Sequence, residues 1–141
     1  MAYKIPIEII EIEHDNFHVL ATALFADGFS GKWVIDTGAS KSVFDRNLEA
    51  YFQAVDGASE DLHSAGISDE PIKSGIGIVA PFSFSSLKVE ELKVALLDMK
   101  HINELYAAST DVEICGLLGS DFLVRHQAII NYRKKIMLLR K

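Results

Sequence analysis

The sequence is poor in three features, and each scarcity excludes a class of protein. Cys115 is the only cysteine among the 141 residues, so a disulfide bond within the chain is impossible. No long apolar run follows the charges near the N-terminus, so neither a signal peptide nor a membrane span is expected, and a cytoplasmic location is predicted. The net charge of −6 argues against a nucleic-acid partner, because such proteins need a concentrated basic surface.

The composition is otherwise that of an ordinary folded protein. Apolar residues make up 49% of the chain and charged residues 24%. A chain of 141 residues is long enough for one substantial core and too short for two typical domains. We therefore expect a single domain over residues 1–141.

Alternating apolar and polar residues, with turn signals between them, predict a chain made mostly of β-strands. Short helices are expected where apolar residues recur at helical spacing, and Ser42 is expected to cap the first of them. Many short strands with few helices favour a closed or partly closed barrel. The expected strands are residues 5–9, 18–26, 32–35, 72–80, 82–89, 92–97, 114–118, 128–132 and 135–140, and the expected helices are residues 42–54, 101–108 and 120–126.

The most informative feature is an acidic residue at the end of an apolar strand. Residues 33–35 (Trp-Val-Ile) lead directly into Asp36, and Thr37, Gly38 and Ala39 follow. An ionised carboxylate in such a place is costly unless it is paired or shares a proton. Asp36 is therefore either a structural turn residue that binds backbone N–H groups or a catalytic group. Gly38 allows the chain to turn where a Cβ atom would clash.

A second motif lies far along the chain. Residues 117–123 read Leu-Leu-Gly-Ser-Asp-Phe-Leu, two aliphatic residues and a glycine before a helical pattern. A loop built around Asp36 needs an apolar floor, and a glycine lets two backbones approach closely. Leu117, Leu118 and Gly119 are therefore expected to form the structural floor of the site.

Together, the D-T-G-A sequence and the downstream L-L-G-x-D-F-L sequence resemble the retropepsin-like aspartic peptidases, the single-domain bacterial and cellular relatives of retroviral proteases. The resemblance covers residues 15–140. It implies an all-β fold class, mostly β with one or two short helices, closed into an acid-protease-type barrel. It also implies that Asp36 is the catalytic residue and that Thr37, Gly38 and Ala39 support the active-site loop.

The resemblance carries a further implication about assembly and chemistry. The family reaction needs two carboxylates, whereas the D-T-G or D-S-G pattern occurs once in this chain. The expected enzyme is a homodimeric aspartic endopeptidase that hydrolyses a peptide or protein substrate, with water activated between two Asp36 carboxylates sharing one proton. No cofactor and no metal ion are expected. The candidates for the flap that contacts substrate are His63, Ser64, Ala65, Gly66 and Ile67.

Two departures and two alternatives complete the sequence interpretation. Retroviral members pair an acidic residue soon after D-T-G-A with an arginine just after the later glycine, but Ser40 and Ser120 occupy these positions here. That brace is expected to be absent. The alternatives are a catalytically silent member that binds peptides or dimerises, and a monomeric β-barrel with an unrelated role. Cys115 lies in an apolar run and is interpreted as a buried thiol rather than a nucleophile.

Overall fold

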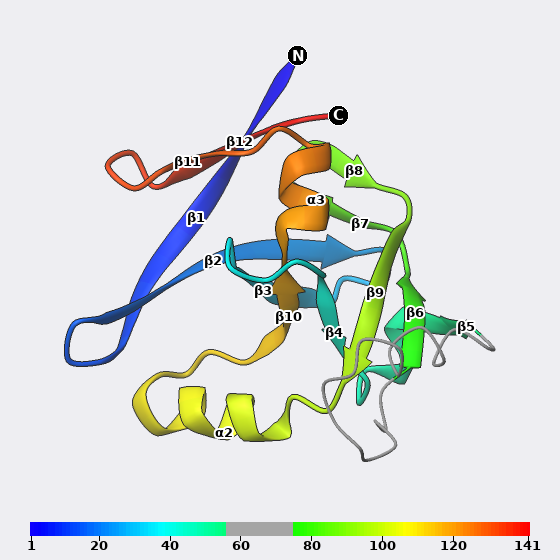
Figure 1. The fold of residues 1–141 in the computed structure, drawn as a ribbon, viewed down its shortest axis with the longest axis horizontal. Coiled ribbons are helices and arrows are strands. Elements are labelled where there is room, and N and C mark those ends of the chain that lie inside the picture. Colours follow the sequence, from blue (N-terminus) through cyan, green and yellow to red (C-terminus); the bar gives the residue numbers. More distant parts are fainter. Residues whose placement is uncertain (56–74) are drawn as a thin grey trace.

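A computed structural model describes residues 1–55 and 75–141, which form mostly strands with a few short helices (Figure 1). The mostly-β class predicted from the sequence is confirmed. The strands are β1 (Ala2–Glu13), β2 (Asn16–Phe25), β3 (Ser30–Ile35), β4 (Val43–Asp45), β5 (Phe52–Val55), β6 (Gly75–Val79), β7 (Phe82–Phe84), β8 (Leu87–Val89), β9 (Leu92–Leu97), β10 (Ile114–Leu118), β11 (Ile129–Asn131) and β12 (Ile136–Arg140). The helices are the 3-10 turn η1 (Glu49–Tyr51), α2 (Lys100–Ser109) and α3 (Ser120–Arg125).

The strands follow one hydrogen-bonded path, in the order β11-β12-β1-β2-β3-β10-β4-β9-β6-β5, and β7 and β8 branch from β2. Within the described residues the path ends at β11 and β5, which do not pair with each other, so the closed barrel is not confirmed. The first half of β1 pairs with β12 and its second half with β2. The two chain termini consequently lie near each other at one end of the molecule (Figure 1).

Strand β3 is buried on both faces, which explains its unbroken apolar run. Trp33 and Ile35 belong to the larger core cluster, in which Trp33 packs against Phe44 with ring centroids 5.4 Å apart. Val34 points the other way, into a smaller cluster that includes Tyr106 of α2. Side chains alternate across a strand, so two separate cores require apolar residues at successive positions. Burial on both faces therefore holds β3, the strand that leads into Asp36, in a fixed position.

The helix predicted for residues 42–54 is wrong. Val43–Asp45 form β4, which pairs antiparallel with β10 and parallel with β9. Only the short turn η1 is helical there, and the chain then extends into β5. Ser42 is fully buried and does not cap a helix. Strand pairing on both sides of β4 outweighs the helical spacing of the apolar residues, as tertiary contacts commonly do.

The other helix predictions are confirmed as α2 and α3, and the predicted strands 92–97 and 114–118 match β9 and β10. The predicted strand 82–89 is instead the hairpin of β7 and β8, which turns at Ser85 with a φ of 52°.

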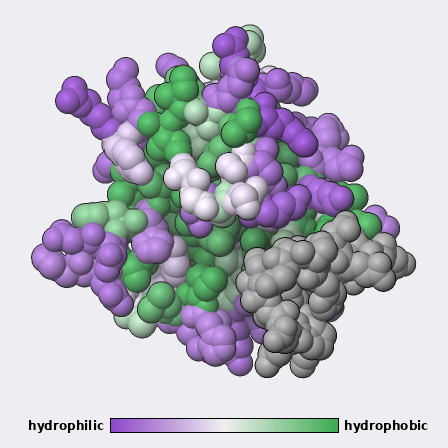
Figure 2. All heavy atoms as spheres, viewed as in Figure 1, coloured by the Kyte–Doolittle hydropathy of each residue, from purple (hydrophilic) through white to green (hydrophobic). Residues whose placement is uncertain are grey.

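None of the described helices is long and apolar enough to cross a membrane. Hydrophobic atoms gather over the middle of the face seen in Figure 2, and hydrophilic atoms surround it.

Candidate active site

The two sequence motifs meet because β3 and β10 are parallel neighbours. In their register Leu117 lies opposite Val34 and Leu118 opposite Ile35, so both strands end together. Asp36 follows β3 and Gly119 follows β10. The Asp36 backbone N–H donates to the Leu118 carbonyl oxygen at 2.9 Å, which extends the ladder by one residue. Residues 83 positions apart in the sequence are thereby brought side by side.

Asp36 stands at the head of a tight turn. Its Oδ1 accepts a hydrogen bond from the Gly38 backbone N–H at 3.0 Å, and its carbonyl oxygen accepts from Ala39 N–H at 3.2 Å. Asp36 is half-buried, whereas Thr37 and Gly38 are exposed. A structural turn aspartate would make the same bond to Gly38, so that bond alone does not assign a role. The turn does hold the carboxylate at the surface rather than in the core.

Gly119 allows the turn to sit directly on the end of β10. A Cβ atom built on Gly119 would lie 2.7 Å from the Ala39 carbonyl oxygen and 2.9 Å from the Lys41 carbonyl carbon. These are backbone atoms, which cannot rotate away. The next N–H, that of Ser120, donates to the same Ala39 oxygen at 2.7 Å. The close approach therefore joins the Asp36 turn to the start of α3.

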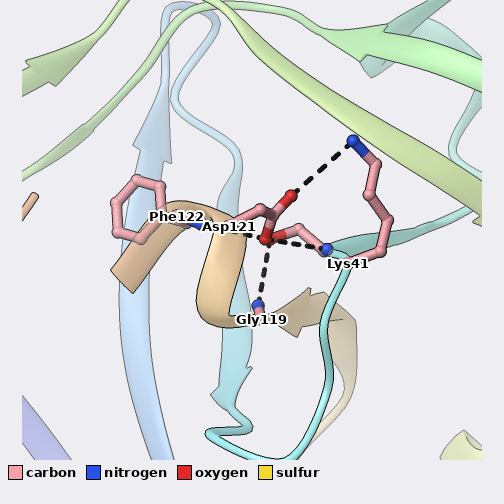
Figure 3. Close-up of polar contacts among 5 residues, drawn as sticks. Lys41, Gly119, Asp121 and Phe122 are labelled. Atoms are coloured by element: carbon pink, nitrogen blue, oxygen red, sulfur yellow. Dashed lines mark hydrogen bonds and ion pairs between the residues drawn. The ribbon is translucent and has the colours of Figure 1, made fainter. Parts of the chain in front are cut away.

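A partly buried polar network connects the residues just after the loop to α3 (Figure 3). Asp121 Oδ1 accepts three hydrogen bonds, from Ser42 N–H at 3.0 Å, Ser42 Oγ–H at 2.7 Å and Phe122 N–H at 2.9 Å. Ser42 Oγ in turn accepts from Gly119 N–H at 3.0 Å. Asp121 Oδ2 lies 3.7 Å from the Lys41 ammonium group. Hydrogen bonds to an ionised carboxylate are stronger than neutral ones, so this network is a rigid connection.

A different polar contact lies next to the positions of the brace that the sequence predicts to be absent. Ser40 and Ser120 do stand where retroviral members carry an acid and an arginine, as the sequence shows. One residue further along each segment, Lys41 and Asp121 form an ion pair of reversed polarity. Ser42 adds the hydrogen bonds that an exposed ion pair would lack. The segment that follows the Asp36 turn is therefore braced within one chain, by residues that sequence reasoning did not assign to the site.

Comparison with known proteins settles the family. The sequence model of a family described as aspartyl protease matches residues 22–122, which include the D-T-G-A motif, all but the last residue of the second motif and most of the strands described above. The chain belongs to the aspartyl protease family. No curated protein sequence matches this aspartyl protease family member closely enough to serve as a relative.

Solved structures show that this family member has the retropepsin-like fold. It resembles a retropepsin-like aspartic protease from Rickettsia conorii with a TM-score of 0.51 and 17% identity, covering 99% of this chain and 90% of that one. It also resembles the retroviral protease-like domain of Ddi1 from Leishmania major, with a TM-score of 0.51 and 14% identity, covering 85% of this chain and 84% of that one. The suspected retropepsin-like resemblance is confirmed for the fold.

The structure brings together most of the residues predicted for the site. Asp36, the turn of Thr37, Gly38 and Ala39, and the segment 117–119 are contiguous, with Leu118 fully buried and Leu117 half-buried beside Val34. The flap candidates His63, Ser64, Ala65, Gly66 and Ile67 lie outside the described residues.

Gly116 is a further residue that sequence reasoning missed. A Cβ atom at this position would lie 2.2 Å from the Val43 carbonyl oxygen and 2.7 Å from the ring of Trp33. The glycine therefore lets β10 sit against β4 and against the large aromatic residue of β3 at once. Its signal in the sequence was its place inside an otherwise apolar strand, where glycine often marks a close approach.

Cys115 takes no part in chemistry at this site. Its side chain is buried in the larger core cluster, and burial raises the pKa of the thiol above its ordinary value of 9.0. A thiol that stays protonated is a poor nucleophile, because the thiolate is the reactive form. Within the described residues, the one group of three potential metal ligands is Glu11, His14 and Asp15, all of them exposed, with Glu11 near the end of β1 and the other two in the turn that leads to β2.

Proposed function

We propose that this family member is an aspartic endopeptidase that acts as a homodimer, with one Asp36 from each subunit. The observation that supports this most strongly is the D-T-G-A turn itself. This turn holds a half-buried carboxylate at the end of a strand that is buried on both faces. The turn lies against Gly119, and a larger residue at position 119 would displace the turn. The match of the aspartyl protease family model over the D-T-G-A motif and nearly all of the second motif agrees with this chemistry.

The mechanism follows from two carboxylates held close together. Like charges at such short range cannot both ionise cheaply, so one keeps a proton and the other acts as a base, as is established for aspartic proteases. The ionised carboxylate removes a proton from a bound water, whose oxygen attacks the peptide carbonyl carbon. The protonated carboxyl group donates to the carbonyl oxygen, and a proton then passes to the leaving nitrogen. The pair titrates as one unit, so its protons belong to neither subunit alone.

The surface around β11 supports association of two chains. β11 is the last strand on its side of the sheet path and pairs only with β12 among the described strands. An uncovered strand edge is a ready template for pairing with another chain. Three large apolar side chains nearby are exposed, Val124 at 74%, Ile129 at 60% and Tyr132 at 63%. Burying such residues would favour a dimer.

Cleavage of a diverse peptide library by the purified protein tests the proposal. Asp36→Asn should abolish cleavage and leave the dimer folded, because the amide cannot supply the ionised base. Asp15→Asn is the matched control, since Asp15 is exposed at a turn with a φ of 62°, a conformation that asparagine accepts readily. A transition-state mimic such as pepstatin should inhibit the wild type.

The pH profile is a second test of the same proposal. One shared proton is required, so the rate should be higher below neutral pH and fall as the pair loses that proton. A flat rate from about pH 4 to pH 9 would contradict proton sharing. A folded dimer that turns over no peptide would instead favour the catalytically silent peptide-binding module. A cytoplasmic location and the lack of a nucleic-acid partner stay predictions from the sequence.

A further inference from the structure

A small cavity of about 130 Å³ lies between α3, the start of β9 and the side chain of Lys41. Its apolar floor is made by Leu92 and Phe122, which are 4% and 1% exposed. Its polar lining is made by Lys41, Lys93, Arg125 and Asp121. Three cations around one small cavity stand out in a chain whose net charge is −6.

The single acidic residue of the lining does not neutralise this cavity. Asp121 Oδ1 is already occupied by three hydrogen-bond donors, and Oδ2 faces Lys41. Lys93 and Arg125 are exposed, and neither forms an ion pair with another residue of the described part of the chain. Two positive charges are therefore uncompensated at the mouth of the cavity.

The size of the cavity limits what it can hold. Ligand pockets for whole small molecules measure roughly 300–1,000 Å³, whereas one water occupies about 30 Å³ of liquid. A volume of about 130 Å³ suits a single side-chain head group. The floor of Leu92 and Phe122 suits methylene groups, and an apolar floor strengthens the attraction between charges above it. Arginine and lysine together favour a carboxylate or phosphate oxygen.

We propose that this cavity receives the carboxylate of an acidic side chain in the peptide substrate. The inference rests on the proposed function, because it gives that function a substrate preference. The cavity is connected to the segment that follows the Asp36 loop through Lys41, five residues after Asp36, and through Asp121, which accepts a hydrogen bond from Ser42. Lys93 and Arg125 are the specificity-determining residues, and Leu92 and Phe122 hold the aliphatic part of the acidic side chain.

A titration that needs no turnover tests the cavity itself. Backbone amide shifts of the wild-type protein are followed at low salt while N-acetylglutamate amide, and separately inorganic phosphate, is added. Saturable shifts should cluster at residues 41, 93 and 121–125, and the Lys93→Gln/Arg125→Gln double variant should bind at least about tenfold more weakly. The control Lys134→Gln, an exposed lysine between β11 and β12, should bind as the wild type does. Absent shifts, or shifts spread evenly over all basic residues, would overturn the anion site.

Cleavage kinetics test the assignment to substrate. In peptide pairs that differ only by Glu or Gln at one position, kcat/KM should favour Glu about tenfold at one position near the cleaved bond. The double variant should cleave both peptides of that pair equally well. Phosphate binding without carboxylate binding, or carboxylate binding without a Glu preference, would refute the substrate role. Failure of the wild type to cleave anything would refute the proposed function, and the titration would still decide the cavity.

Discussion

Replacing Gly119 by alanine tests the contact on which the geometry of the candidate active site depends. The added Cβ atom would lie 2.7 Å from the Ala39 carbonyl oxygen and 3.0 Å from that of Lys41. These distances are shorter than an ordinary van der Waals contact between carbon and oxygen, so the loop would have to move away by about half an ångström or more. Neither neighbour is a flexible side-chain end, so the displacement must be taken up by the backbone that carries Asp36.

Two magnitudes follow from this displacement. Inserting a methyl group into a closely packed region costs about 1–3 kcal/mol of unfolding free energy. Because a displacement of about 1 Å at a catalytic group can cost roughly a hundredfold in rate, half that displacement should lower kcat/KM about tenfold. The hydrogen bond from Ser120 N–H to the Ala39 oxygen should lengthen at the same time.

The assays are urea denaturation for stability and kcat/KM on a cleaved peptide for function. Gly75→Ala is the matched control for stability, because a Cβ atom there meets no atom within 4 Å and the backbone φ needs no glycine. The unfolding free energy of Gly75→Ala, obtained from its urea midpoint, should stay within about 0.5 kcal/mol of that of the wild type. A Gly119→Ala protein that unfolds at the same urea concentration as Gly75→Ala, with wild-type kcat/KM, would refute the reasoning.

Three further predictions concern the surroundings of the loop. Asp121→Ala should lower the unfolding free energy by about 2–4 kcal/mol, because it leaves the buried Ser42 donors unsatisfied. Asp121→Asn should lower it less. Equal urea midpoints for the two variants and the wild type would contradict this prediction. Gly116→Ala should prevent normal folding, which circular dichroism would detect as lost cooperative unfolding, because its Cβ would overlap the Val43 oxygen. Burial raises the pKa of Cys115 above 9.0, so the unfolded chain loses this proton first and stability should fall as pH rises above about 9. Cys115→Ala should flatten that fall in urea midpoints measured across the pH range, and an unchanged slope would contradict the assignment.

The part of the fold that the sequence predicts well is the part governed by local pattern. The apolar run 33–35 and the alternation of apolar and polar residues near the N-terminus identify strands, because the order of apolar residues along a strand reflects which of its faces are buried. The segment 42–54 misled the prediction because its environment comes from β9 and β10, which are distant in the sequence. No local pattern reports pairing with such partners.

The same distinction applies to the site. Asp36 and Gly119 could be found because each stands in a short motif whose residues act together. Ser42 and Lys41 could not be assigned, since their partner Asp121 is about 80 positions away and the contact exists only after β3 and β10 pair. The polarity of the ion pair is likewise reversed from the retroviral arrangement, so the family pattern gave no guide to it.

The distance between the two Asp36 carboxylates in a crystal structure of the purified assembly tests the central claim most directly. The account predicts that they face each other across a two-fold axis, within hydrogen-bond reach of one another or of one shared water, roughly 2.6–3.2 Å for each bond. Carboxylates that face open solvent, or that lie far from any counterpart, would contradict it.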